Sequence, residues 1–241
     1  MSGTDHEKFN RIIKGLHELR PHSFMDSVRR VIWEYPNTAG PFADALSIGQ
    51  IKSKKWLLEE LKLCSAGNQE QLDLGQVYIL AGWYGTLAYL LKEDPQIHIK
   101  TIVNIDQDPI CEAISQRLNL DWIENWRYKA VTMDIHNVDY SKDFGFRVWS
   151  KGKDQIVKHR SQCDTIICTS CEHIAEWSKL YEKFPEGKLL VLQSNNFDIP
   201  EHTNRVDSLE QFEEQTPMSR VLFSGELDCD LYTRFMRIGV K

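Results

Sequence analysis

The chain has 241 residues, of which 41% are hydrophobic and 27% charged, with a formal net charge of −6 and a sequence pI near 5.8. This length and composition fit one compact domain with an extension and fall short of two full domains. The acidic balance argues against bulk, non-specific binding to nucleic acid, which needs a surface that neutralises phosphates, but it leaves room for a local basic patch.

The sequence carries no sign of a membrane or secretory segment. No apolar run reaches the roughly 20 residues that a membrane helix needs. Residues 1–20 are charged early and lack the apolar core of a signal peptide. We therefore expect a cytoplasmic protein with no membrane partner. Its cysteines are expected to be reduced and mostly buried, and they are Cys64, Cys111, Cys163, Cys168, Cys171 and Cys229.

The first part of the chain is predicted to be helical. Apolar residues recur at helical spacing in residues 5–35 and again in residues 45–63, with a turn-rich, proline-containing break at residues 36–41. We expect residues 1–66 to form a helical extension or lid and residues 67–241 to form the main domain. Three polar residues of the second segment could cover a ligand or form a solvated face, and they are Gln50, Lys52 and Lys55.

From residue 76 onward, short apolar runs alternate with helical patterns. The alternation predicts a parallel sheet with helices on both faces, which is an α/β fold of the Rossmann-like three-layer type. The predicted strands are near-continuous apolar runs, as strands buried on both faces are. They comprise residues 76–81, 101–105, 128–133, 164–168 and 189–193, and the first helices between them comprise residues 86–92 and 109–119.

The chain ends in two further strand-like runs, residues 219–223 and 232–238. The segment that joins them is rich in Gly, Asp and Glu and is too short to hold a crossover helix, so we expect an antiparallel hairpin. The sheet would then have seven strands, mostly parallel, with an antiparallel last strand.

Residues 140–162 interrupt the alternation with a basic insert that has no helical period. We interpret its centre, residues 146–157, as a small inserted hairpin. Its cations and its interleaved aromatic residues could contact a nucleic-acid strand, or the aromatic side chains could pack back on the sheet. Nucleic acid is therefore a possible partner that we do not favour. The aromatic residues are Phe144, Phe146 and Trp149.

Residues 77–108 have the layout of a β-α-β nucleotide-binding unit. A first apolar strand ends at Gly82, Gly85 closes a tight segment before a helix, and a second apolar strand ends at Asp106. Glycine lets the backbone turn sharply near a ligand, and an acid after the second strand can accept both hydroxyls of a ribose. The full G-x-G-x-x-G is absent, because an aromatic pair stands between the glycines. An ordinary α/β turn with a capping glycine is the alternative.

Four segments in chain order resemble the motifs of class I S-adenosylmethionine-dependent methyltransferases, and they are VYILAGWYGTLAYLL, NIDQDP, VTMDIH and DTIICTSCEHI. The reversed last strand is also similar to that fold. The resemblance covers roughly residues 45–241 and is nearest to small phage and bacterial members with a Gly-Trp-Tyr-Gly first motif. It implies an enzyme that uses S-adenosyl-L-methionine as its cofactor and moves the methyl group to a polar acceptor, which the sequence does not identify.

The resemblance also implies where the cofactor would lie. The first loop would wrap its methionine part, Asp106 would hold the ribose, Asp134 would lie by the adenine, and the residues after the fourth strand would border the methyl group. The implied cofactor-binding residues are Gly82, Trp83, Tyr84, Gly85, Asp106, Gln107, Asp134, Ile135 and Ser170. For Asp106 and Asp134, a capping or plain loop role is the alternative, and Asp108 is the better helix cap.

The acceptor would lie over the residues that follow the fourth and fifth strands. The candidate substrate-binding residues are Cys171, Asn195 and Asn196. Cys171 belongs to the loop expected at the reaction centre, and the two consecutive amides can hydrogen-bond a polar acceptor. Glu172 and His173 are the candidate catalytic residues, since either could act as a general base. Methyl transfer in line with a sulfonium needs little beyond positioning, so a base could be unnecessary.

Cys168 and Cys171 form a C-x-x-C, with Cys163 and His173 nearby, which could suggest zinc or a redox pair. No second C-x-x-C follows at finger spacing, so we expect packed cysteines and no metal site.

Two other functions stay open. The same fold could transfer the aminocarboxypropyl group of S-adenosylmethionine or cleave the cofactor, and a non-catalytic protein could bind a partner through the basic insert. No Asp/Asn-Pro-Pro-Tyr/Phe motif follows the fourth strand, which argues against amino methylation of a DNA base.

Overall fold

A computed structural model describes residues 22–65, 71–125, 127–142, 144–150 and 155–241, together with Glu7 and residues 13–15. Apart from those few positions, the helix expected before residue 22 lies outside the described residues. Within the described part of the chain, every helix is too short or too polar to cross a membrane.

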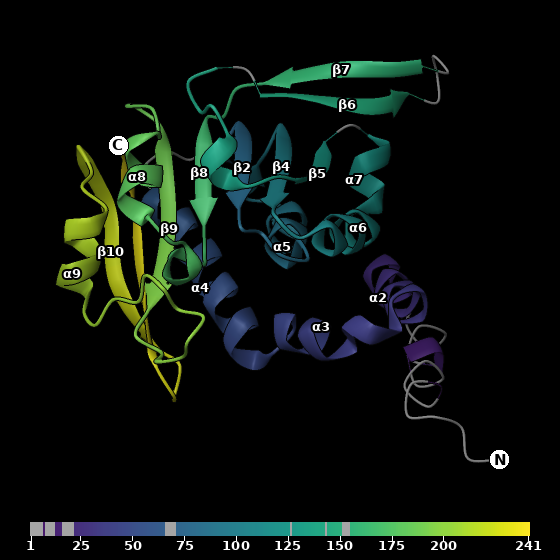
Figure 1. Cartoon of the computed structure of the whole chain (residues 1–241), viewed down its shortest axis with the longest axis horizontal. Coiled ribbons are helices and arrows are strands. Elements are labelled where there is room, and N and C mark those ends of the chain that lie inside the picture. Colours follow the sequence, from purple (N-terminus) through teal and green to yellow (C-terminus); the bar gives the residue numbers. More distant parts are fainter. Residues whose placement is uncertain are drawn as a thin grey trace.

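A seven-stranded sheet forms the centre of the molecule (Figure 1). Its strands are β2 (Gln76–Leu80), β4 (Thr101–Asp106), β5 (Tyr128–Thr132), β8 (Thr165–Cys168), β9 (Leu189–Asn195), β10 (Arg220–Asp228) and β11 (Thr233–Val240). Their order is β10-β11-β9-β8-β2-β4-β5. The strands from β9 to β5 pair in parallel, whereas β11 is antiparallel to both of its neighbours, β9 and β10. The predicted seven-stranded sheet with a reversed last strand is confirmed.

Helices cover both faces of this sheet. Within the described residues they are α2 (Ser23–Glu34), α3 (Ala39–Ala45), α4 (Ile48–Ser65), α5 (Thr86–Glu93), α6 (Pro109–Leu118), α7 (Leu120–Glu124), α8 (Trp177–Glu182) and α9 (Leu209–Gln215), with 3-10 turns η1 (Pro36–Thr38), η2 (Ile135–Asn137) and η3 (Cys171–His173). Successive strand side chains point to opposite faces. Val77 and Ile79 of β2 therefore pack in one apolar cluster with α4 and α5, while Tyr78 and Leu80 pack in another with α8 and α9. Both faces of the sheet are core, as the continuous apolar runs predicted.

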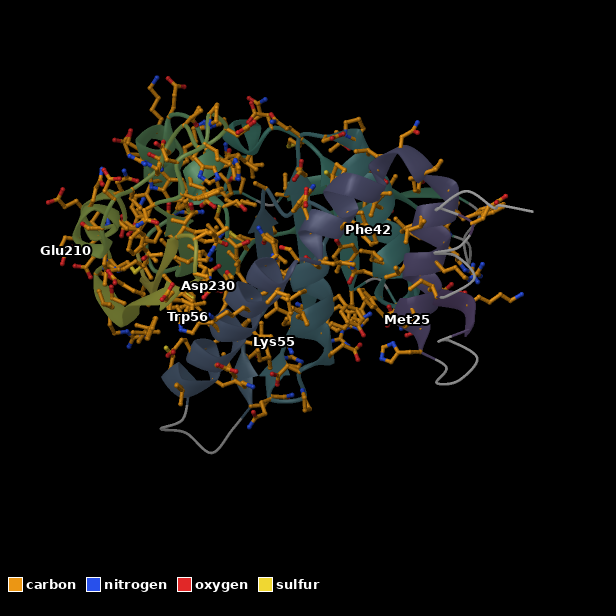
Figure 2. The ribbon with its side chains drawn as sticks, turned by 90° about the horizontal axis from the view of Figure 1, so that it is seen from below. Met25, Phe42, Lys55, Trp56, Glu210 and Asp230 are labelled. Atoms are coloured by element: carbon orange, nitrogen blue, oxygen red, sulfur yellow. The ribbon has the colours of Figure 1, made fainter. Side chains whose placement is uncertain are left out.

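The N-terminal helices lie across the end of the sheet toward which β8 points in Figure 1. Helices α2 and α3 join α6 in a third apolar cluster that includes Val31, Phe42 and Ile114. Figure 2 looks onto this layer, with Phe42 on α3 and Lys55 and Trp56 on α4. The break expected at residues 36–41 is present but shorter than predicted, because α2 ends at Glu34 and η1 leads directly into α3 at Ala39. Burial of an apolar side chain at Phe42 stabilises this short helix despite the prolines.

A pair of side-chain hydrogen bonds fixes α4 to the sheet. The hydroxyl of Ser53 donates to Oε1 of Gln193 at 2.8 Å, and Nε2 of Gln193 donates to the carbonyl of Ser53 at 3.3 Å. Both residues are buried, so these bonds form in a region without competing water.

Two smaller strand pairs lie outside the main sheet. β1 (Leu72–Asp73) pairs in parallel with β3 (Ile97–His98), and β6 (Phe144–Ser150) pairs in antiparallel fashion with β7 (Gln155–Ser161). The hairpin predicted in the basic insert is therefore confirmed, with longer strands than expected. It lies beyond one end of the sheet's strands, whereas α3 and α4 lie beyond the other end (Figure 1). For this hairpin the structure describes the backbone pairing and not the side chains, so both alternatives for its aromatic residues stay open.

Two strand boundaries differ from the prediction because of pairing with β11. β9 continues to Asn195, which pairs with Arg234, so residues 193–195 are buried strand rather than loop. β10 continues to Asp228, which pairs with Thr233, so most of the expected acidic connection is also strand. The partner of β9 is distant in sequence, whereas β10 pairs with the strand that directly follows it.

Candidate functional site

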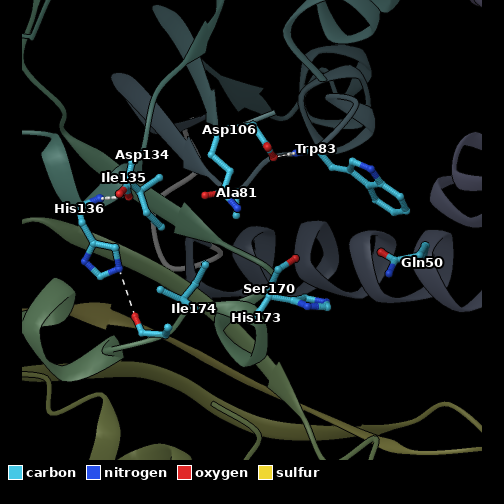
Figure 3. A pocket seen from close by; sticks show the side chains of 12 residues that line it. Gln50, Ala81, Trp83, Asp106, Asp134, Ile135, His136, Ser170, His173 and Ile174 are labelled. Carbon is cyan, nitrogen blue, oxygen red and sulfur yellow. Dashed lines mark hydrogen bonds between the residues drawn. The ribbon is translucent and has the colours of Figure 1, made fainter. Parts of the chain in front are cut away.

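A cavity of about 560 Å³ lies at the carboxyl ends of β2, β4, β5 and β8 (Figure 3). The strand order reverses here, since β2 has β4 on one side and the later strand β8 on the other. Open α/β sheets bind ligands at such a switch point, and the volume is that of a small-molecule site. The predicted site residues that line the cavity are Trp83, Asp106, Gln107, Asp134, Ile135, Ser170 and His173.

The loop after β2 is attached to the end of β4 through two residues of that strand. The backbone N–H of Trp83 donates to Oδ2 of Asp106 at 2.9 Å, and the carbonyl of Trp83 accepts from Nδ2 of Asn104 at 3.3 Å. Ala81 and Trp83 both have a positive φ, 47° and 48°, which is uncommon for residues with a side chain. The loop therefore has a defined conformation in which Trp83 faces the cavity.

The two glycines of the first motif are needed for packing of this loop. A Cβ on Gly82 would collide with the side-chain amide of Asn104. Gly85 has a φ of +71°, and a Cβ there would collide with a polar cluster formed by Ser115, Asn119 and Tyr128. Neither glycine lines the cavity, so their requirement is explained by close approach to β4, β5 and α6.

Tyr84 points away from the cavity. Its ring is 3% exposed and packs against Phe42 of α3, with ring centroids 5.7 Å apart. Trp83 stacks on Tyr84 at a centroid distance of 5.1 Å and also lines the cavity. The aromatic pair in the Gly-Trp-Tyr-Gly motif thus connects the N-terminal helices to the cavity wall.

Asp106 is half-buried at the end of β4, and the backbone orients both of its carboxylate oxygens. Oδ2 accepts from Trp83, and Oδ1 accepts from the N–H of Asp108 at 3.1 Å. The helix cap is Asp108, whose carboxylate accepts from the N–H of Ile110 at 2.9 Å. Each carboxylate oxygen can accept more than one hydrogen bond, so Asp106 retains acceptor capacity toward the cavity.

The residues that follow β5 and β8 form a cavity wall that includes two isoleucines. Ile135 and Ile174 line the cavity and are 7% and 8% exposed. Asp134 is exposed and accepts from the N–H of His136 at 2.8 Å, while Nε2 of His136 lies 3.1 Å from the carbonyl of Ala175. Asp134 therefore caps η2 and also lines the cavity, so the structural and ligand-binding roles are compatible.

Glu172 belongs to a buried polar network behind the cavity. The residue is 2% exposed, and Oε1 accepts from Nδ2 of Asn195 and lies 3.6 Å from Nη2 of Arg234. Nη1 of Arg234 donates to the carbonyl of Thr169 at 2.9 Å. Neither Glu172 nor Asn195 lines the cavity, and Asn195 is occupied in holding Glu172.

The other predicted acceptor contacts also have internal partners. Oδ1 of Asn196 accepts from the N–H of Thr233 at 2.8 Å. Cys171 is fully buried, with its thiol 3.6 Å from the carbonyl of Cys168, and burial raises the pKa of that thiol. The cysteines of the described residues are all free thiols, and each except the half-buried Cys64 is buried. The C-x-x-C is thus part of the core, as expected.

One of the three lid candidates on α4 reaches the cavity. Gln50 lines it, whereas Nζ of Lys52 donates to the carbonyl of Asp228 at 2.6 Å and Lys55 is exposed. Between them, Lys54 is 6% exposed and donates to Oε1 of Gln50 at 2.5 Å. Burial, together with the charge of Arg234, lowers the pKa of Lys54 to about 7.

The chain matches known proteins in fold, although the searches by sequence gave no match. No protein-family model matches the chain, and no curated protein matches its sequence. Solved structures do match. The CurJ carbon methyltransferase has 12% identity and a TM-score of 0.54, over 96% of this chain and 71% of that one. Mycolic acid cyclopropane synthase CmaA1, in complex with S-adenosylhomocysteine, has 10% identity and a TM-score of 0.51, over 80% and 84% of the two chains.

A third match is geranyl diphosphate C-methyltransferase from Streptomyces coelicolor, in complex with Mg²⁺, geranyl-S-thiolodiphosphate and S-adenosylhomocysteine. It has 6% identity and a TM-score of 0.51, over 78% of this chain and 76% of that one. The chain has the fold of the class I S-adenosylmethionine-dependent methyltransferases. The fold predicted from the four motifs is therefore confirmed, whereas the subtype with a Gly-Trp-Tyr-Gly motif stays a prediction.

Several residues of the cavity in this methyltransferase fold were missed by sequence reasoning. They are Ala81, His136, Ile174 and Ala175. Ala81 is the last residue of the first predicted strand, His136 and Ile174 are adjacent to predicted site residues, and Ala175 lies two residues after His173. A wider window around each strand end would have included all four. His202 was also missed. Its ring lies against that of His173, with centroids 4.5 Å apart, although no motif surrounds it in the sequence.

Proposed function

We propose that the chain binds S-adenosyl-L-methionine in this cavity and transfers its methyl group to a polar acceptor. The observation that carries the proposal is the carboxylate of Asp106, which the backbone orients beside a cavity at the switch point of the sheet. The same fold in CmaA1 and in geranyl diphosphate C-methyltransferase holds S-adenosylhomocysteine, the demethylated product, which supports this cofactor.

The lining residues fit the parts of such a cofactor. Asp106 would accept the ribose hydroxyls, Ile135 and Ile174 would contact the adenine faces, and Asp134 would accept from its amino group. Trp83 would lie by the methionine part, where an aromatic face favours a positive sulfonium. When bound, the cofactor would supply an electrophilic methyl group near Ser170 and His173.

The chain's own contribution to the reaction would be mainly positioning. His173 lines the cavity and is exposed, so its imidazole could take a proton from an acceptor. Glu172 does not line the cavity, so we assign it a role in holding η3 in place through Asn195 and Arg234. The N-terminal helices would cover the acceptor, with Gln50 as their contact to the cavity.

Isothermal titration calorimetry with S-adenosylhomocysteine tests the proposal. Asp106→Ala should lower the affinity at least tenfold, because hydrogen bonds to a charged group contribute about 1.5–3 kcal/mol each. Asp108→Ser is the matched control, since it keeps a cap acceptor for α6 and should leave the affinity unchanged. Full affinity in Asp106→Ala, or no binding to the unmodified chain, would contradict the proposal.

Product analysis distinguishes the alternatives. With a purified acceptor, mass spectrometry separates addition of a methyl group from addition of the aminocarboxypropyl group, and free fragments would indicate cofactor cleavage. A chain that binds no S-adenosyl compound would instead favour a non-catalytic protein acting through the basic insert.

A further inference from the structure

We propose that Glu172, His173 and His202 bind one divalent transition-metal ion beside the cavity. One carboxylate oxygen of Glu172 and one ring nitrogen from each histidine lie within 4.8 Å of one another. Glu172 and His173 belong to η3, and His202 belongs to the segment between β9 and α9. This set shares only His173 with the cysteine-based site weighed from the sequence, and it departs from the expectation of no metal.

The first observation concerns the free oxygen of Glu172. Oε1 is occupied by Asn195 and Arg234, but Oε2 is buried and has no hydrogen-bond partner among the described residues. A buried carboxylate oxygen without a partner is costly, because it has lost its water and gained nothing in return. A metal ion at Oε2 would supply the missing interaction.

The second observation concerns the ring orientation of the two histidines. Nδ1 of His173 lies 3.2 Å from the carbonyl of Glu201, and Nδ1 of His202 lies 2.7 Å from the carbonyl of Phe197. A carbonyl only accepts, so Nδ1 carries the proton and Nε2 has the lone pair in each neutral ring. Metal-binding histidines are oriented in this way, with the second ring nitrogen donating to a backbone carbonyl.

The ligand set indicates the class of metal. Two imidazoles and one carboxylate suit zinc or iron(II) and leave at least one coordination position open. Zinc ligands at about 2.1 Å from the ion lie at most about 4.2 Å apart, so binding would draw the three side chains slightly together. Glu172 is fixed by its network, whereas His173 is exposed and His202 half-buried, so the histidines can move.

The open position would face the acceptor, because His173 also lines the cavity. This role rests on the proposed methyl transfer, and it would replace His173 as a general base, because the metal would occupy the lone pair of its imidazole. A metal lowers the pKa of a coordinated hydroxyl or thiol, whose proton would pass to solvent. The acceptor atom would then bond to the methyl carbon while the carbon–sulfur bond breaks and its electron pair stays on sulfur, leaving a neutral thioether.

Titration of the chelator-treated full chain with Zn²⁺ tests the site. Calorimetry should show one tight site per chain, weakened at least tenfold in His202→Ala and in Glu172→Gln. His202→Ala is the more informative variant, since Glu172→Gln leaves Arg234 without its buried counter-charge and could impair folding. The matched control is His98→Ala, an exposed histidine on β3 whose removal should leave the affinity for Zn²⁺ unchanged.

Two outcomes would overturn the metal site. One is equal affinity for Zn²⁺ in the unmodified chain and in His202→Ala. The other is an absorption spectrum of the Co²⁺-loaded chain with thiolate charge-transfer bands, which would place the metal on cysteines. Binding of S-adenosylhomocysteine to the metal-free chain is measured in parallel. If that binding persists while Zn²⁺ does not bind, the metal site is wrong and the proposed function stands.

Discussion

The backbone N–H of Trp83 donates a hydrogen bond of 2.9 Å to the carboxylate of Asp106. This contact connects the loop after β2 to the end of β4 and brings an aromatic face and a carboxylate to one cavity. The second carboxylate oxygen accepts from the N–H of Asp108. Because the backbone fixes both oxygens before any ligand binds, little ordering would remain to be done on binding.

Gly85→Ala should destabilise the fold by about 2–5 kcal/mol, combining a left-handed backbone with overpacking. Its Cβ would collide with the polar cluster on α6 and β5. Gly187→Ala is the control, because Gly187 has a similar φ of +79° but no atom within 4 Å of the added Cβ. It should cost only about 1–2 kcal/mol. Urea unfolding measures both, and equal costs would contradict the collision.

Lys54→Met should flatten the dependence of stability on pH. The unfolded chain keeps the Lys54 proton up to a pKa near 10.5, whereas burial lowers the folded pKa to about 7. The unfolded state therefore binds more protons between these values, and stability rises with pH across that window by at most about 5 kcal/mol. Urea unfolding at pH 7 and pH 9 should show this rise in the unmodified chain and a smaller one in Lys54→Met. The same rise in both proteins would refute the assignment.

Gln193→Met should loosen α4 by removing both of its hydrogen bonds to Ser53. The buried hydroxyl of Ser53 would lose its acceptor, at a cost of about 1–3 kcal/mol. In the double variant with Ser53→Ala, no unpaired hydroxyl remains, so the double variant should be more stable than Gln193→Met alone. Chemical denaturation of the three variants decides this, and strictly additive losses would argue against a coupled pair.

Replacing residues 144–161 with a short Gly/Ser linker should leave the affinity for S-adenosylhomocysteine unchanged. The hairpin of β6 and β7 lies at the opposite end of the sheet's strands from α3 and α4 (Figure 1). Calorimetry on a variant with an unchanged circular dichroism spectrum measures the effect. A loss of affinity in such a folded variant would show that the insert contributes to the cavity.

The fold and one edge of the site could be predicted because they depend on local patterns. The apolar strands of residues 101–105 and 128–133 are each followed by an acid, Asp106 and Asp134. Because the carboxyl ends of parallel strands meet at one edge of the sheet, the two acids could be predicted to lie at the same edge. Pairing with a distant strand is not local. The extension of β9 to Asn195 depends on β11, and Asn195 therefore became part of the buried network behind the cavity.

The contacts around the first motif could not be predicted from the sequence. The two glycines were predicted to let the backbone turn close to a ligand, but the sequence does not reveal which neighbouring side chains a Cβ there would meet. For Gly85 that is a cluster from α6 and β5. His202 had no periodicity or motif to mark it, and its contact with His173 arises only because the segment after β9 returns to η3. One bond in that return is the backbone N–H of Asn204 donating to the carbonyl of Glu172 at 2.9 Å.

A crystal structure of the chain with S-adenosylhomocysteine tests the central claim most directly. The account predicts the ribose hydroxyls on the carboxylate of Asp106, with the adenine between Ile135 and Ile174 and the sulfur toward Ser170. Full-occupancy ligand elsewhere on the molecule, or an empty cavity at saturating ligand, would contradict it.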